Sequence, residues 1–328
     1  MTGDVAPTLA GIEAAADRLA GVAVQTPLIE SPALNARVGG RVLLKAETLQ
    51  RTGSFKFRGG YNFLSQIPAD TRVRGVVAYS SGNHAQGVAA AAEIFGVPAT
   101  IVMPADAPQA KIDNTRGFGA EIVAYDRHTE SREDIAAAIA GKSGATLVPP
   151  FDHAWTIEGQ GTVGLEIAAQ CATLKTLPDE VLVCCGGGGL TSGIAIALAD
   201  RSPSTRITAV EPAGFDDAMR SLAAGQRLSN APGASSICDA LLSPSTGDLT
   251  FAAMHAQGVS GIAVDDDEVR AAMAYAWGTL KLVLEPGGAV ALAAILSGKI
   301  ETRDRTIAAI LSGGNVDAAL FSACIEAG

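Results

Sequence analysis

The stretch RTGSFKFRGG places Lys56 between two phenylalanines, in a chain that has only seven lysines. The Thr-Gly-Ser at 52–54 is typical of a helix N-cap, so we expect Lys56 in a first helical turn, where the helix dipole disfavours a cation. Phe55 and Phe57 predict partial burial. Both effects lower the pKa of an amine, which makes the lysine a nucleophile toward aldehydes. The alternative is a lysine whose ammonium group reaches water.

A run of four glycines follows the apolar segment VLVCC and precedes a predicted helix. Its members are Gly186, Gly187, Gly188 and Gly189. Without Cβ atoms, and at a helix N-terminus, their N–H groups can approach an anion closely. Leu190 and Thr191 replace the Lys-Ser or Lys-Thr of a P-loop, and the spacing GxGxxG fails at Thr191 or Ser192. The run therefore predicts a cup for one phosphate monoester. The alternative is a tight turn required for packing.

A lysine that condenses with an aldehyde and a cup for one phosphate together describe pyridoxal 5′-phosphate (PLP). Ser312 ends the last predicted strand, before Gly313-Gly314, and could give one hydrogen bond to a flat ligand. By itself Ser312 is weak evidence.

Two further strand-to-helix turns carry polar residues. In YSSGNHAQGVA, Ser80, Ser81, Asn83 and the local N–H groups could receive a carboxylate. His84 is either an acid or base or, as we favour, a structural histidine, and the whole turn could be an ordinary capped helix start. In AVEPAGFDDAM, neighbouring carboxylates suit a hard cation such as Mg²⁺ or Ca²⁺, whereas helix capping by acids is the alternative.

Short β-branched runs alternate with Ala-rich helical patterns along most of the chain. This alternation predicts an α/β fold with mostly parallel sheets covered by helices on both faces. The segment 225–250 is rich in Gly, Ser and Pro, so we expect it to form a long ordered loop. Strands are expected at 75–79, 99–104, 120–125, 145–149, 181–185, 206–212 and 306–311, and helices at 83–95, 107–117, 129–140, 155–171, 191–200, from 215 onward, and after the final glycine turn.

Composition restricts the classes of function. The 328 residues carry a net charge of −10, which disfavours nucleic acid as a partner. The sequence shows no signal peptide and no apolar stretch approaching the length of a membrane span. Five cysteines without metal-site spacing favour reduced thiols in a cytoplasmic protein.

With these motifs in this order, the chain resembles the fold-type II PLP enzymes that include threonine and serine dehydratases, serine racemase and 3-hydroxyaspartate dehydratase. The resemblance runs from about residue 25 almost to the C-terminus, without a regulatory extension. The motifs that carry it are SFKFRGG, SSGNHAQGVA, GGGGL, VEP, EPGGA and LSGGNVD.

This resemblance implies a two-domain fold similar to the tryptophan synthase β chain. Residues 1–72 and 153–328 would form a large PLP-binding domain, and residues 73–152 a small inserted α/β domain. It also implies a homodimer. The chain departs from the family's usual pattern at Ala240, where relatives often have Gly after Asp, and around Glu285, whose role stays open.

The resemblance also implies roles for the residues around the cofactor. Lys56 would form the Schiff base, and Phe55 would lie against the ring. Asn83 would bond the phenolic oxygen, the segment Gly186–Leu190 would hold the phosphate, and Ser312 would bond the pyridine nitrogen.

The substrate would be bound by the turn after residue 79, where Ser80, Ser81, Gly82, Asn83 and His84 would grip its α-carboxylate. Ser81 matches the racemase acid/base on the face opposite the lysine. Arg132 matches an arginine that can reach a distal carboxylate, although a solvated helix arginine is the alternative. A divalent cation (Mg²⁺, Mn²⁺ or Ca²⁺) would be bound by Glu211, the carbonyl of Phe215, and Asp217.

The implied activity is that of a lyase that removes water from serine or threonine and yields a 2-oxo acid and ammonia. The alternatives are a 3-hydroxyaspartate dehydratase, a serine or aspartate racemase, a β-replacement enzyme and, in a different class, a non-catalytic protein that binds a phosphorylated metabolite.

Overall fold

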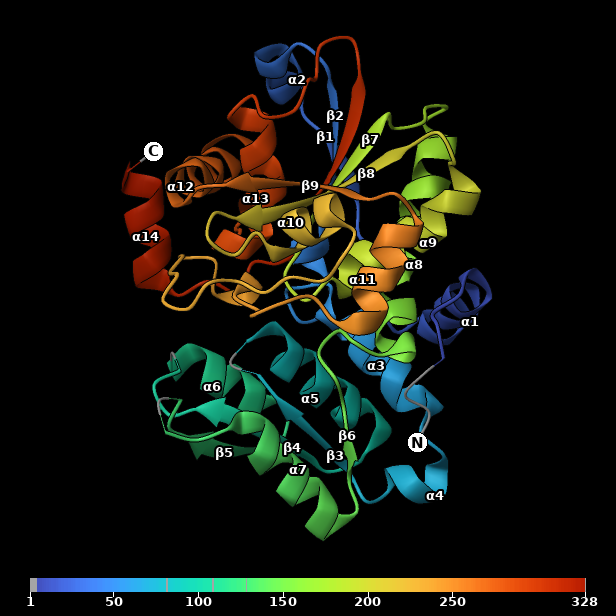
Figure 1. Cartoon of the computed structure of the whole chain (residues 1–328), viewed down its shortest axis with the longest axis vertical. Helices are drawn as coiled ribbons and strands as arrows, with labels where there is room; N and C mark the ends of the chain where they lie inside the picture. The colour runs from blue at the N-terminus through green and yellow to red at the C-terminus, as the bar shows by residue number, and fades with distance from the viewer. Residues whose placement is uncertain (1–4, 81, 108, 128, 328) are drawn as a thin grey trace.

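The computed structural model describes residues 5–80, 82–107, 109–127 and 129–327. Their strands form two sheets, which lie in the upper and lower parts of Figure 1. The larger sheet has the order β1-β2-β10-β7-β8-β9, and the smaller has the order β5-β4-β3-β6. All pairings are parallel except that of β1 with β2.

The bounds of the strands show that the chain forms the larger sheet in two passes. The larger sheet contains β1 (Leu28–Glu30), β2 (Arg41–Lys45), β7 (Glu180–Cys184), β8 (Arg206–Pro212), β9 (Ser260–Val264) and β10 (Thr306–Ile310). The smaller contains β3 (Val76–Tyr79), β4 (Ala99–Pro104), β5 (Glu121–Tyr125) and β6 (Thr146–Leu147). Along the chain, the strands of the smaller sheet therefore lie between β2 and β7 of the larger one.

Helices cover both faces of the larger sheet, with α1, α8 and α9 on one side and α12, α13 and α14 on the other (Figure 1). The helices of the first half are α1 (Leu9–Leu19), α2 (Pro32–Val38), α3 (Lys56–Gln66), α4 (Ala69–Arg72), α5 (Asn83–Phe95), α6 (Gln109–Gly117), α7 (Arg132–Ser143) and α8 (Ala154–Thr173), with the 3₁₀ turn η1 (Glu47–Leu49). The second half adds α9 (Gly189–Arg201), α10 (Asp217–Ala224), α11 (Asp248–Ala256), α12 (Asp266–Tyr275), α13 (Pro286–Leu296) and α14 (Ala318–Ala327), with the 3₁₀ turn η2 (Asp239–Leu241) and the π-helical η3 (Ala276–Leu280).

The central strands explain why the sequence reads as continuous apolar runs. Every residue of β7 is buried, as are all residues of β8 after its first. Strands that are buried on both faces need apolar residues on both faces, which removes the alternation typical of half-exposed strands. The predicted α/β class with mostly parallel sheets is confirmed.

Most of the predicted elements occur within a few residues of their expected ends, but three corrections are needed. The strand expected at 145–149 is only Thr146–Leu147. The loop expected at 225–250 contains η2 and the start of α11. No strand was predicted before residue 75, where β1 and β2 lie, and β9 was also missed.

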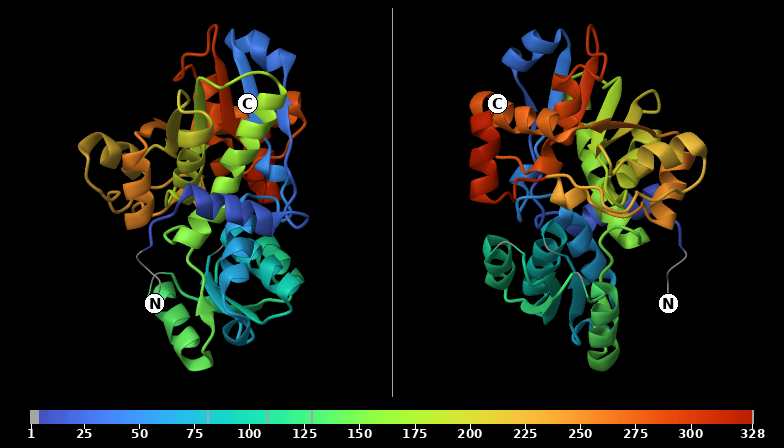
Figure 2. Two further views of the ribbon diagram at one scale, coloured as in Figure 1. Left: turned by 90° about the vertical axis from the view of Figure 1, so that its right-hand side faces the viewer. Right: turned by 60° about the vertical axis from the view of Figure 1, so that its left-hand side comes forward.

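The predicted domain boundaries after residues 72 and 152 stay a prediction. All strands of the smaller sheet lie between Val76 and Leu147, inside the predicted small domain. However, α3 precedes the first boundary and packs against both α5 and α8, so it contacts the helices of both parts. Figure 2 shows the same two parts from two further sides.

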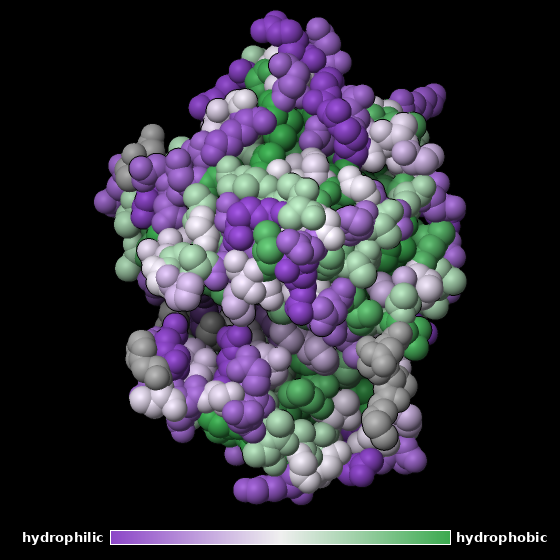
Figure 3. Space-filling model, viewed as in Figure 1, coloured by the Kyte–Doolittle hydropathy of each residue, from purple (hydrophilic) through white to green (hydrophobic). Residues whose placement is uncertain are grey.

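The surface in Figure 3 mixes hydrophilic and hydrophobic side chains and is hollowed between its upper and lower parts at the left of the view. In the part of the chain that is described, no helix combines the length and the apolar character that crossing a bilayer requires.

Candidate active site

Residues from both parts of the molecule line one cavity at the carboxyl ends of β3, β7 and β10. This is where open α/β sheets place their ligands. The predicted site residues in its wall are Phe55, Lys56, Ser80, Gly82, Asn83, His84, Arg132, Gly186, Gly187, Gly188, Gly189, Leu190 and Ser312. Ser81 lies outside the described residues.

Lys56 is the first residue of α3, as expected, although Phe55 occupies the N-cap position without a side-chain cap bond. The predicted N-cap at 52–54 is wrong, because the Thr52 and Ser54 hydroxyls form no hydrogen bond with the described residues, and Ser54 forms an isolated β-bridge with Gly313. The Lys56 Nζ donates a hydrogen bond to the Pro150 carbonyl at 2.8 Å. Burial of this amine lowers the pKa of Lys56 to about 8, which favours the neutral nucleophile.

The glycine run turns from β7 into α9, and packing excludes side chains from it. A Cβ on Gly187 would lie 2.2 Å from the Phe151 ring, and Gly188 has a φ of +90°. The Thr250 hydroxyl donates to the Gly187 carbonyl at 2.7 Å and holds the turn in place. Because the first N–H groups of a helix lack partners within it, this turn is suited to one phosphate group.

Asn83 is fixed by residues distant in the sequence. Its Nδ2 donates to the Glu285 carboxylate at 2.5 Å, and its Oδ1 accepts from Asn315 at 2.7 Å. One N–H of the amide is therefore left for a ligand. Burial, followed by the charge of Asp239, raises the pKa of Glu285 to about 7.

His84 is held as a neutral side chain. Burial and then the charge of Lys56 lower the pKa of His84 to about 3, so its Nε2–H donates to the Val148 carbonyl at 2.9 Å. A histidine in this state does not donate a proton near neutral pH, which supports the structural interpretation. Nearby, the Ser80 hydroxyl accepts a hydrogen bond from the Gly82 N–H at 3.1 Å.

Arg132 begins α7 and reaches the cavity wall from the smaller part of the molecule. Its guanidinium lies 5.3 Å from the centre of the Tyr79 ring and bonds Glu133 at 2.8 Å. The side chain remains 42% exposed, so it has donors left for an anion in the cavity.

Comparison with known proteins identifies the family. The model of a pyridoxal-phosphate dependent enzyme family matches residues 20–313. The chain belongs to this family of PLP-dependent enzymes. It is 41% identical to an L-threo-3-hydroxyaspartate ammonia-lyase of a Pseudomonas species, over 95% of this chain and 96% of the other. It is 39% identical to an L-threonine ammonia-lyase of Thermotoga maritima, over 98% and 79% of the two chains. A solved maize serine racemase superposes with a TM-score of 0.91 at 37% identity, covering 98% of both chains.

These relatives confirm the predicted family, the fold-type II architecture, PLP as the cofactor, and an enzyme of the lyase type. The cavity fits PLP by its own chemistry. It offers a lysine amine that bonds the Pro150 carbonyl, a turn that admits no side chains, and the Ser312 hydroxyl in one wall.

The predicted cation site lies apart from the cavity lining. Glu211 is buried and accepts the N–H groups of Ala218 and Met219, and Asp217 accepts bonds from Asn230 and the Thr246 N–H. Among the described residues, no group of three or more His, Cys, Asp or Glu side chains could hold a metal. A set of two carboxylates and the Phe215 carbonyl was predicted, and it stays a prediction.

Several residues of the cavity wall were not predicted as site residues. They are Tyr79, Lys111, Pro150, Phe151, Cys184, Asp239, Ala240, Leu241, Leu242, Ser243 and Glu285. Two of them, Asp239 and Glu285, stand in the segments that depart from the family pattern, which was a usable signal. Lys111 lies in an ordinary helical segment, and its sequence context carries no such signal.

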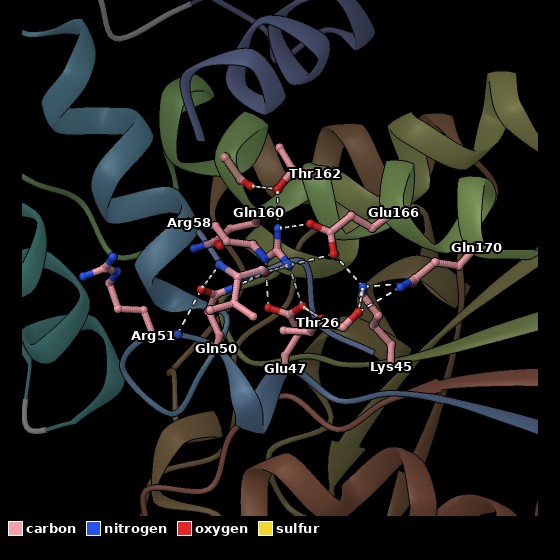
Figure 4. A network of polar contacts seen from close by, with 12 residues as sticks. Thr26, Lys45, Glu47, Gln50, Arg51, Arg58, Gln160, Thr162, Glu166 and Gln170 are labelled. Atoms are coloured by element: carbon pink, nitrogen blue, oxygen red, sulfur yellow. Dashed lines mark hydrogen bonds and ion pairs between the residues drawn. The ribbon is translucent and has the colours of Figure 1, made fainter. Parts of the chain in front are cut away.

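A second buried cation follows Lys56 on α3. Arg58 bonds the carboxylates of Glu47 and Glu166, and Lys45 joins the same network through Glu166 at 2.5 Å (Figure 4). The network also includes Thr26, Gln50, Thr162 and Gln170, and it connects α3 to β2, η1 and α8.

Proposed function

We propose that this PLP-dependent lyase removes water from 3-hydroxyaspartate and releases ammonia and the corresponding 2-oxo dicarboxylic acid. The observation that carries the proposal is Arg132, a second cation in the wall of the cavity that holds Lys56. The relative named L-threo-3-hydroxyaspartate ammonia-lyase supports the same substrate. Serine and threonine, which the sequence favoured, lack a second carboxylate and would not use Arg132.

The residue roles follow from their positions. Bound PLP supplies a ring that withdraws electrons from the substrate Cα. The Lys56 amine takes the Cα proton, and the helix N-terminus after Gly82 binds the α-carboxylate. The Arg132 guanidinium binds the second carboxylate through its planar donors.

Elimination then breaks the β carbon–oxygen bond, and the hydroxyl leaves with a proton as water. Hydrolysis of the resulting enamine product gives the 2-oxo acid and ammonia. Ser312, in the cavity wall, would hold the ring nitrogen with a neutral hydroxyl, which carries no full charge. This weakens the electron sink and favours prompt loss of the hydroxyl.

The test is ammonia release by the holoenzyme from L-serine, D-serine, L-threonine and the isomers of 3-hydroxyaspartate. We expect the highest kcat/KM for one hydroxyaspartate isomer. Recovered substrate is analysed for its opposite enantiomer, which a racemase would produce. Activity on serine or threonine without activity on any hydroxyaspartate isomer would contradict the proposed substrate.

The proposed cation ligands are Glu211, Asp217 and the carbonyl of Phe215. Burial raises the pKa of Glu211 to about 8 and also raises the pKa of Asp217, as expected of acids that lack a neutralising cation. Adding Mg²⁺, Mn²⁺ or Ca²⁺ should raise the Tm of the wild type, and Glu211→Gln should remove this increase. A Tm that is insensitive to all three ions and to a chelator would reject the site.

A homodimer in the cytoplasm is also proposed. Leu49, Trp277 and Val283 are 48%, 48% and 40% exposed, and the Thr48 hydroxyl bonds the Val283 carbonyl, which ties two of these segments together. Leu49 and Val283, on these two adjoining segments, offer exposed apolar surface that suits a second copy of the chain. Light scattering after size exclusion should give twice the 33.2 kDa mass of the chain.

A further inference from the structure

Lys111 and Asp239 form an ion pair in the wall of the cavity, from opposite parts of the molecule. Lys111 belongs to α6, beside the smaller sheet, and Asp239 to η2, in the long segment that lies above α6 in Figure 1. The roles proposed above for the cofactor and substrate leave this pair unexplained. An ion pair that faces a ligand cavity is well placed to exchange one partner for an ionic ligand.

The Lys111 ammonium lies close to the turn that receives the α-carboxylate. A Cβ built on Gly82 would come within 3.9 Å of the Lys111 Nζ. Arg132, the first residue of α7, lies over the Tyr79 ring at 5.3 Å. One cation therefore lies beside Tyr79 and another beside Gly82, and both side chains line the cavity.

The two partners of the ion pair differ in burial. The Lys111 side chain is 11% exposed, whereas the Asp239 side chain is 46% exposed. Asp239 can therefore turn into water at small cost, but Lys111 without an anion would be a nearly buried, unpaired charge. A substrate carboxylate that enters the cavity can take the place of Asp239 without leaving Lys111 unpaired.

Nearby electrostatics agree with this arrangement. Burial is the main cause of the raised pKa of Glu285, the charge of Asp239 raises it further, and the charge of Lys111 lowers it. Glu285 in turn bonds Asn83 at 2.5 Å. The Lys111–Asp239 pair therefore acts on the same polar groups that surround the cofactor and substrate positions.

We propose that Lys111 binds the distal carboxylate of the substrate together with Arg132. Asp239 stays paired with the Lys111 ammonium until this carboxylate displaces it. The inference rests on the proposed function, because only a dicarboxylic substrate carries the second anion. Lys111 and Asp239 would then set the preference for hydroxyaspartate over serine and threonine.

The first experiment compares KM for two substrates in two variants of the holoenzyme. Lys111→Gln should raise the KM for 3-hydroxyaspartate by about 10- to 100-fold, as for loss of one charged hydrogen bond, with little change for serine. Asp239→Asn keeps a hydrogen-bond acceptor but removes the competing charge, so it should lower the KM for 3-hydroxyaspartate and leave that for serine unchanged. The control is Lys299→Gln, since Lys299 pairs with Glu268 and is absent from the cavity lining.

The second experiment measures binding without turnover, by calorimetry on the holoenzyme. Malate matches 3-hydroxyaspartate without its amine, and 3-hydroxypropionate matches serine without its amine. We expect Lys111→Gln to weaken malate binding, Asp239→Asn to strengthen it, and both variants to bind 3-hydroxypropionate as the wild type does. Thermal unfolding of each variant verifies that it is folded.

Equal increases in KM for both substrates in Lys111→Gln, or weaker malate binding in Asp239→Asn, would overturn the inference. If the wild type fails to act on hydroxyaspartate, the proposed substrate is wrong, and the malate series still decides the role of Lys111. If the wild type acts on hydroxyaspartate and Lys111→Gln leaves its KM unchanged, the proposed function stands and this inference fails.

Discussion

Lys56 and Arg58 are two cations on one helix, two residues apart, and their surroundings give them opposite properties. The Lys56 amine bonds one carbonyl and faces the cavity, and burial lowers its pKa to about 8. Burial acts in the same direction on Arg58, but Glu47 and Glu166 outweigh it, and the pKa of Arg58 is raised. Positions two apart on a helix point about 200° from each other, so the two side chains meet different environments.

The comparison shows that burial alone does not decide what a cation does. In the cavity, no carboxylate among the described residues forms an ion pair with the Lys56 amine, which is available for chemistry. On the other side of α3, two carboxylates neutralise Arg58 and Lys45, and the network connects the helix to α8 (Figure 4). On the same helix, Arg58 therefore anchors α3 through its ion pairs, and Lys56 supplies the reactive amine.

The largest effect should come from removing the reactive member of this comparison. Lys56→Ala should lower kcat by about 10²- to 10⁴-fold, because it removes the amine proposed to take the Cα proton. The purified protein should also lose its visible absorbance band. Lys142→Ala, at an exposed lysine of α7, is the matched control and should keep both. Normal turnover by Lys56→Ala would remove the basis of the comparison.

Removing Arg58, the cation that is paired with carboxylates, should lower the free energy of unfolding. Arg58→Met leaves the buried Glu47 carboxylate without its guanidinium partner, while Glu166 keeps Lys45. Breaking a buried ion pair costs about 3–5 kcal/mol in the free energy of unfolding. Arg41→Met, which breaks the exposed pair with Glu30, should cost only about 0–1 kcal/mol. Urea denaturation measures both. Similar losses of unfolding free energy in the two variants would show that the buried network stabilises the protein no more than the exposed pair does.

A substitution in the glycine turn tests whether this part of the cavity must be free of side chains. In Gly187→Ala the added Cβ would overlap the Phe151 ring, so we expect a loss of about 1–3 kcal/mol in stability and weaker retention of PLP. Gly141→Ala, in α7 with nothing within 4 Å of its Cβ, should instead stabilise the protein by about 0.5–1 kcal/mol. Dialysis followed by cofactor absorbance measures retention, and equal retention in both variants would speak against the turn as the phosphate site.

The smallest effect concerns pH. The lowered pKa of Lys56, about 8, means that its neutral form dominates above that pH and is lost below it. The rate at which apoenzyme takes up PLP should rise about fivefold from pH 7 to pH 8 and then level off, following the neutral fraction. Because the charge of Glu285 raises the pKa of Lys56, Glu285→Gln should move the midpoint to lower pH. A rate that keeps rising toward pH 10.5 would indicate an unperturbed lysine.

Much of the fold and the centre of the site could be predicted because their signals are local. Apolar runs predicted the buried parallel strands, and the glycines after VLVCC predicted the anion turn that now lines the cavity. The N-terminal strands β1 and β2 were missed because their burial depends on pairing with each other and with β10, far along the chain. The predicted N-cap at 52–54 failed for a related reason, since Ser54 pairs with Gly313, a residue far along the chain.

The sequence by itself determined the α/β class, the lysine at the start of α3 and the glycine turn before α9, because each depends on residues that are neighbours along the chain. The tertiary structure alone decided which charged and polar side chains meet: Lys111 with Asp239, Asn83 with Glu285, and Arg58 with Glu166, pairs separated by 128, 202 and 108 residues. Whether a charged side chain is reactive, neutralised or exchangeable depends on burial and on its partner, and distant segments supply both only after the chain has folded.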